Sequence, residues 1–152
     1  MGSGETLHAS CVVIGEGGIL IRGESGLGKS TLARELVHGA RRAGRFARLV
    51  SDDRTHIAPH HERLVARPVE AIAGLIEIRG LGIVPVRNEP GAVIRLVVDL
   101  TMEEPTRLPE REECRTSLCG IVLPRLRQRM GPALVSLVLG GGSGFHDTLM
   151  TQ

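Results

Sequence analysis

The chain has 152 residues, which favours one domain, and 41% of them are hydrophobic, which is enough for a packed core. Its 19 basic and 17 acidic side chains leave a net charge of +2, too small to indicate a nucleic-acid partner. Only Phe46 and Phe145 are aromatic, which excludes an aromatic platform for stacking bases.

The cysteines and the hydropathy indicate the cellular compartment. Three cysteines, an odd number without C-x-x-C spacing, disfavour a disulfide framework or a zinc site. No apolar run approaches the roughly 18–20 residues that cross a bilayer, and the first residues lack the features of a secretory signal. We therefore expect a cytoplasmic protein without a membrane partner.

In chain order, the pattern predicts an α/β domain with a strand-rich mixed sheet. Strands at 7–14 and 18–22 flank a hairpin turn, and a helix follows at 29–42. Further strands are expected at 46–51, 56–58, 63–66, 74–80, 92–100, 121–126 and 134–139, with a helical turn at 69–73 and an irregular segment at 101–117. A single domain thus spans 1–139, and a glycine-rich flexible tail is expected at 140–152.

The segment between the second strand and the helix has the G-x-x-x-x-G-K-S pattern of a P-loop, or Walker A motif. The candidate nucleotide-binding residues are Gly23, Glu24, Ser25, Gly26, Leu27, Gly28, Lys29 and Ser30. The glycines allow main-chain amides to surround an anion, and the start of the helix adds its positive dipole end. Lys29, the only lysine of the chain, is expected to reach the β- and γ-phosphates, and the Ser30 hydroxyl to bind Mg²⁺.

Acidic residues in two further segments are candidates for completing a phosphotransfer site. Asp52 and Asp53 end a predicted strand, where one carboxylate suits a metal and the other a proton; an ordinary turn or helix cap is the alternative. Glu77 lies between two isoleucines of a strand expected to be buried, where a lone charge requires a metal or an ion-pair partner. Arg79, on the same strand face, is the candidate partner.

Three segments together resemble the catalytic domain of HPr kinase/phosphorylase, a bacterial family that phosphorylates a regulatory serine of HPr, the phosphocarrier of the sugar phosphotransferase system. They are 23–30, 49–53 and 75–83, the last reading Leu-Ile-Glu-Ile-Arg-Gly-Leu-Gly-Ile. His8 precedes Lys29 by 21 residues (29 − 8 = 21), as the active-site histidine of the family does. The resemblance extends from about residue 7 to 139 and lacks the usual N-terminal domain of the family.

The resemblance implies a protein-serine kinase that uses ATP and Mg²⁺, is often hexameric, and also removes the phosphate by phosphorolysis with inorganic phosphate. It implies catalytic residues at His8, Lys29, Asp52, Asp53, Arg79 and Arg107, and metal ligands at Ser30, Glu77 and Asp53. Asp53 is preferred over Asp52 as the base that deprotonates the serine. Residues 126–132 differ from the family's basic loop associated with dephosphorylation, so kinase activity is the firmer expectation.

The residues alone leave two other functions open. One is a P-loop kinase for a small metabolite, and the other is a non-catalytic regulatory module that senses ATP. Phosphorylation of purified HPr, compared with a panel of metabolites, separates the first of these from the protein kinase.

Overall fold

The structure, a computed structural model, describes residues 4–140, so the tail expected at 140–152 lies outside the described residues except for Gly140. The helix predicted at 29–42 and the strand predicted at 92–100 have the expected bounds, and the mixed α/β fold is confirmed. The elements are β1 (Glu5–Leu7), β2 (Ala9–Ile14), β3 (Gly17–Arg22), α1 (Lys29–Arg42), β4 (Ala47–Ser51), β5 (Thr55–His60), β6 (Arg63–Pro68), η1 (Glu70–Ile72), β7 (Leu75–Ile78), β8 (Gly82–Pro85), β9 (Ala92–Leu100), η2 (Arg111–Cys114), β10 (Arg115–Leu118), β11 (Ile121–Gln128) and α2 (Pro132–Gly140).

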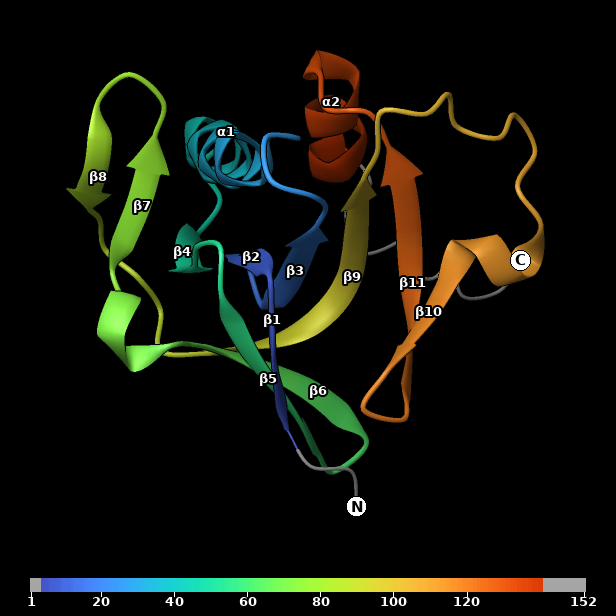
Figure 1. The fold of residues 1–152 in the computed structure, drawn as a ribbon, viewed down its shortest axis with the longest axis horizontal. Helices are drawn as coiled ribbons and strands as arrows, with labels where there is room; N and C mark the ends of the chain where they lie inside the picture. Colours follow the sequence, from blue (N-terminus) through green and yellow to red (C-terminus); the bar gives the residue numbers. More distant parts are fainter. Residues whose placement is uncertain (1–3, 141–152) are drawn as a thin grey trace.

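Nine strands form one mixed sheet, and β9 is its central strand. One side of β9 pairs with β3, while the other side pairs first with β6 and then with β11. β3, β9 and β11 are parallel to one another, and the other pairs in the sheet are antiparallel. β2 and β4 extend the sheet beyond β3, whereas β6, β5 and β1 curve away below the helices (Figure 1).

Both faces of the central strands are buried. Along β2, Val12 and Ile14 pack in the cluster that includes α1 and α2, whereas Cys11 and Val13 pack in the cluster on the opposite face. Successive side chains of a strand point to opposite faces, so both sets are apolar. This burial on two sides accounts for the nearly continuous apolar runs of β2, β3 and β9.

Helix α1 lies across the sheet with one apolar face. Leu32, Leu36 and Ala40 are fully buried and lie four residues apart, the spacing that aligns side chains along a helix. Arg41 and Arg42 occupy the last turn, where positive charge complements the helix dipole. The chain then leaves the helix at Gly44, whose φ of 78° favours glycine.

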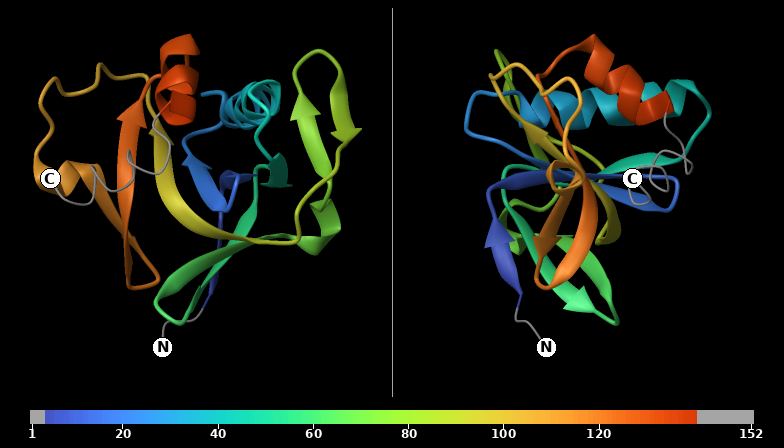
Figure 2. Two further views of the ribbon diagram at one scale, coloured as in Figure 1. Left: turned by 180° about the vertical axis from the view of Figure 1, so that it is seen from behind. Right: turned by 90° about the vertical axis from the view of Figure 1, so that its right-hand side faces the viewer.

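Residues 134–139 form most of helix α2, so the prediction of a strand at this position is wrong. A short apolar run is compatible with either element, and the packing partner decides between them. Leu134 and Val138, four residues apart, are buried in the cluster that contains α1. The two helices lie side by side (Figure 2), and Gly39 permits the contact, because a Cβ there would lie 2.5 Å from Leu139 Cδ1. Among residues 4–140, no helix has the length and apolar character needed to cross a membrane.

The segment 75–83 forms an isolated hairpin of β7 and β8 rather than a single buried strand. Because this hairpin lies outside the large sheet, Glu77 is exposed, contrary to expectation. β7 ends at Ile78, so Arg79 lies in the turn and the predicted pairing on one strand face is wrong. Residues 101–117 are also more regular than predicted, since they include η2 and the start of β10.

Asp99 links three strands near the end of β3. Its carboxylate accepts hydrogen bonds from Arg22 Nε at 2.7 Å and Nη2 at 2.8 Å, and a further one from Arg125 Nε. Burial alone raises the pKa of Asp99, but the hydrogen bonds and charges of the two arginines outweigh it and hold that pKa below its ordinary value. The ion pairs thus join β3, β9 and β11 directly before the P-loop.

Candidate active site

Residues 23–28 connect β3 with α1 and form a tight loop. Gly26 and Gly28 have φ values of 87° and 105°, a region that glycine adopts without strain. A Cβ at Gly28 would also lie 3.1 Å from Met130 Cγ, so a side chain there would require Met130 to shift. The first turn of α1 has no acidic residue and no side-chain cap. Its amide groups therefore suit an anion.

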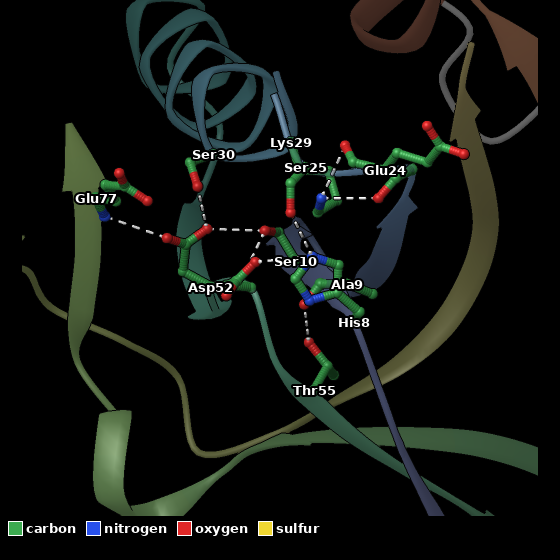
Figure 3. Close-up of polar contacts among 12 residues, drawn as sticks. His8, Ala9, Ser10, Glu24, Ser25, Lys29, Ser30, Asp52, Thr55 and Glu77 are labelled. Carbon is green, nitrogen blue, oxygen red and sulfur yellow. Dashed lines mark hydrogen bonds and ion pairs between the residues drawn. The ribbon is translucent and has the colours of Figure 1, made fainter. Parts of the chain in front are cut away.

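Lys29 folds back onto the P-loop. Its Nζ donates to the carbonyl oxygens of Gly23, at 2.7 Å, and Glu24, at 3.3 Å (Figure 3). The residue is only 6% exposed. Charged phosphate oxygens accept hydrogen bonds from an ammonium group more strongly than neutral carbonyls do. Lys29 is therefore placed to exchange its carbonyl partners for phosphate oxygens.

Asp52 follows directly after β4, is 6% exposed and accepts three hydrogen bonds. Its Oδ1 accepts from the hydroxyls of Ser10 and Ser30, each at 2.7 Å. Its Oδ2 accepts from the backbone amide of Glu77 at 3.1 Å (Figure 3). The structure therefore brings the predicted acidic pair to the last residue of the P-loop, through a contact between Ser30 and Asp52.

Asp53 occupies a different environment from Asp52. Its carboxylate lies 3.3 Å from His8 Nε2, and both side chains are about half exposed, at 55% and 50%. The His8 Nε2 atom also lies 3.3 Å from Ser25 Oγ, on the P-loop. Asp53 has a φ of 65°, which is uncommon for a residue with a side chain. The acidic pair thus comprises one buried carboxylate beside Ser30 and one accessible carboxylate beside a histidine.

Ser10 is a site residue that the sequence reasoning missed. It is fully buried in β2, where its hydroxyl donates to Asp52 and accepts from the Asp53 amide at 3.1 Å. One side chain therefore holds both members of the acidic pair. A hydroxyl in an otherwise apolar strand is the signal that was available, because a buried polar group needs a partner.

The oxygen ligands beside the P-loop suit Mg²⁺. Ser30 and Asp52 provide a hydroxyl and a buried carboxylate, and the Glu77 side chain extends from β7 toward them (Figure 3). Within residues 4–140, no three His, Cys, Asp or Glu side chains form a metal-binding group. Mg²⁺ commonly takes one or two carboxylates, phosphate oxygens and water, so these few donors fit the ion. Asp53, the third expected ligand, lies beside His8 instead.

The two predicted arginines lie in exposed turns. Arg79 is in the β7–β8 turn, and Arg107 is in the segment between β9 and η2. In the part of the chain that the structure describes, neither makes a hydrogen bond or an ion pair. The segment with Arg107 leaves the sheet beside the P-loop, since a Cβ at Gly23 would lie 3.1 Å from Leu100 Cβ. Their catalytic roles remain predictions.

The basic residues of 126–132 are paired within the chain. Arg127 Nη2 lies 2.5 Å from Glu103 Oε2, and Arg129 Nη2 lies 2.9 Å from Glu104 Oε2. These ion pairs join the end of β11 to the segment that follows β9. Met130, from the same stretch, covers Gly28 of the P-loop.

Comparison with known proteins identifies relatives that cover most of this chain. The profile of the family described as "HPr Serine kinase C-terminal domain" matches residues 1–127. The HPr kinase/phosphorylase of Geobacillus thermodenitrificans (strain NG80-2) is 39% identical over 131 residues, which cover 79% of this chain and 40% of that protein. The HPr kinase/phosphorylase of Limosilactobacillus reuteri (strain DSM 20016) is 34% identical over 134 residues, which cover 80% and 40%.

A solved structure supports the same fold. The Hpr(Ser) kinase/phosphatase from Coxiella burnetii superimposes with a TM-score of 0.73 at 24% sequence identity, covering 97% of this chain and 93% of that chain. The family model and the curated relatives confirm the resemblance inferred from three short segments. The chain spans about 40% of the length of the curated relatives that it matches.

Proposed function

Since this chain belongs to the HPr serine kinase C-terminal domain family, we propose that it is the catalytic domain of an ATP- and Mg²⁺-dependent kinase that phosphorylates a serine of HPr. One observation carries the proposal: the Ser30 hydroxyl of the P-loop lies 2.7 Å from Asp52, and the adjacent Asp53 lies beside His8. The P-loop, the Ser30–Asp52 pair and an accessible carboxylate are thus contiguous, which supports phosphate binding, metal binding and proton transfer at one site. The choice of HPr as the partner rests on the names of the relatives.

The buried half of the site holds the nucleotide. Lys29 binds the β- and γ-phosphates after it leaves the carbonyls of Gly23 and Glu24, and the loop amides bind the remaining phosphate oxygens. Ser30 and Asp52 would hold the magnesium ion, with the Glu77 carboxylate as a further ligand. When bound, Mg²⁺ neutralises charge on the transferring phosphoryl group.

The accessible half of the site serves the acceptor. Asp53 takes the proton of the serine hydroxyl as the serine oxygen bonds to the γ-phosphorus and ADP leaves. His8, 3.3 Å away, orients this carboxylate. The exposure of Asp53 supports this role, because a serine on a folded protein must reach the base. Arg79 and Arg107 are proposed to contact the transferred phosphoryl group, where their positive charge stabilises the transition state.

We also propose that the protein catalyses the reverse reaction, forms a homo-oligomer and is located in the cytoplasm. In phosphorolysis, Asp53 returns the proton to the serine oxygen while inorganic phosphate takes the phosphoryl group to form pyrophosphate. Arg127 and Arg129 are the basic residues nearest in sequence to the family loop associated with this step, and both are paired with glutamates. The structure therefore supports the forward reaction more directly than the reverse reaction.

Incubation of the protein with purified HPr, Mg²⁺ and γ-labelled ATP tests the function. We expect label on HPr, and we expect Asp53→Asn to reduce transfer by about a hundredfold, the usual scale for loss of a general base, while ATP affinity is retained. Glu16→Gln, in the β2–β3 turn at the opposite end of β3, is the matched control with wild-type activity.

Each other outcome has a defined meaning. Absence of label on HPr with wild-type protein that binds ATP refutes the kinase. Full transfer by Asp53→Asn refutes the role of that carboxylate as base. A chase with inorganic phosphate then tests the reverse reaction, because label that stays on HPr shows a kinase without phosphorylase activity.

A further inference from the structure

A hollow of about 320 Å³ lies between α1 and the base of the β7–β8 hairpin. The two elements are neighbours in Figure 1, with β4 between and below them. Most of the lining is apolar and comes from α1, β4 and the β7–β8 hairpin with the residue that follows it: Ala33, Val37, Leu49, Ile76, Ile78 and Val86. None of these residues belongs to the P-loop, so the hollow is separate from the phosphate-binding site.

The rim of this hollow is basic. Arg34, His38 and Arg41 lie on one face of α1, because their spacing of four and three residues follows the helical repeat. Arg87, which follows β8, completes the rim. None of the ten described residues that line the hollow is acidic.

Two of the three arginines at the rim have no partner among the described residues. Within residues 4–140, Arg34, His38 and Arg87 make neither hydrogen bonds nor ion pairs. Arg41 is oriented by a hydrogen bond from Nε to the Ala47 carbonyl at 2.9 Å. Arg22 and Arg125, by contrast, are both paired with the carboxylate of Asp99. The rim therefore has donors for an anion that this part of the chain does not supply.

We propose that the hollow binds a small organic carboxylate with an apolar body. The apolar walls accommodate the body of the ligand, and the planar guanidinium groups match the two oxygens of a carboxylate. The volume lies near the lower end of the range for small-molecule sites, which favours a compact ligand over a peptide.

A ligand at this position contacts β7, the strand whose Glu77 amide donates a hydrogen bond to Asp52. Ile76 and Ile78 line the hollow, and the amide of Glu77, between them, donates to Asp52 Oδ2 at 3.1 Å. A shift of β7 on binding therefore changes the hydrogen bonding of the buried carboxylate. The effect on phosphotransfer rests on the proposed function, whereas binding itself does not.

Isothermal titration calorimetry with 4-phenylbutyrate tests the binding site, with 4-phenylbutan-1-ol and acetate as probes that lack the charge or the apolar body. We expect 4-phenylbutyrate to bind at least about tenfold more tightly than either, since one charge-assisted hydrogen bond has about this effect. Arg87→Gln and Arg34→Gln should each weaken binding by about tenfold. Arg63→Gln, on the distant β5–β6 hairpin, should bind as the wild type does.

The outcomes separate this proposal from the proposed function. No heat of binding at millimolar 4-phenylbutyrate, or equal binding of the alcohol, overturns the carboxylate site. Unchanged affinity in both arginine variants also overturns the carboxylate site. The site is likewise overturned if the protein binds no ligand but self-associates and Arg87→Gln abolishes that self-association. Ligand binding in a protein that does not phosphorylate HPr leaves the site intact and refutes only the kinase. Circular dichroism and ATP affinity verify the folding of each variant.

Discussion

The buried hydroxyl of Ser10 provides a direct test of how the acidic pair is held. In Ser10→Ala, Asp52 loses one of its three hydrogen-bond donors, and the amide of Asp53 loses its acceptor. Ser10 is fully buried, so water does not replace the hydroxyl without rearrangement. Asp52 keeps its contacts with Ser30 and with the Glu77 amide.

The size of the effect follows from these two contacts. An unsatisfied buried amide costs about 1–3 kcal/mol, and a hydrogen bond to a charged group contributes about 1.5–3 kcal/mol. Because the two losses share one atom and overlap, we expect the free energy of unfolding to fall by about 2–4 kcal/mol in total. For a chain of 152 residues, this lowers Tm by roughly 4–16 °C.

Urea denaturation and calorimetric melting measure this loss, with Ser117→Ala as the matched control. Ser117 is exposed on β10, so its replacement should change the free energy of unfolding by less than about 0.5 kcal/mol. If Ser10 also positions the base, kcat for HPr phosphorylation falls by about tenfold, equivalent to about 1.4 kcal/mol. KM for ATP should remain near the wild-type value, because Lys29 and the P-loop are unaltered.

The reasoning fails if Ser10→Ala is as stable as Ser117→Ala. Unchanged kcat, at a temperature where both proteins are folded, contradicts a role of Ser10 in positioning the base. A fall in stability with unchanged kcat would show a structural role only.

Two further predictions concern titratable groups outside the site. Because the pKa of Asp99 is lowered in the folded state, its ion pairs contribute their full stability above the pKa of the unfolded chain, about 4. This stability is lost as the pH falls through the lower pKa of the folded protein. Denaturation between pH 2 and 7 should therefore show a steeper acidic loss in the wild type than in Asp99→Asn, and equal slopes would contradict this. Burial raises the pKa of the Cys11 thiol, so iodoacetamide at about pH 8 should label Cys11 only after unfolding, whereas the partly exposed Cys114 should react faster. Mass spectrometry distinguishes the two cysteines. Rapid labelling of Cys11 in the folded protein would contradict its burial.

The sequence by itself determined the elements whose interactions are local. The P-loop and the helix after it form a contiguous segment, and Lys29 contacts carbonyls only five and six residues away. The same applies to β9, whose run of β-branched residues is buried on both faces and has no competing pattern. The family resemblance rested on such segments too, and it was confirmed.

Only the tertiary structure decided how distant residues meet. Ser10 and Ser30 reach Asp52 from 42 and 22 positions away, and no local pattern encodes that distance. Residues 134–139 form a helix because α1 covers one side of them, whereas a neighbouring strand would have favoured the predicted extended form. Likewise, Glu77 is exposed because β7 pairs with β8 outside the large sheet, since burial depends on what packs against a strand and not on its own composition.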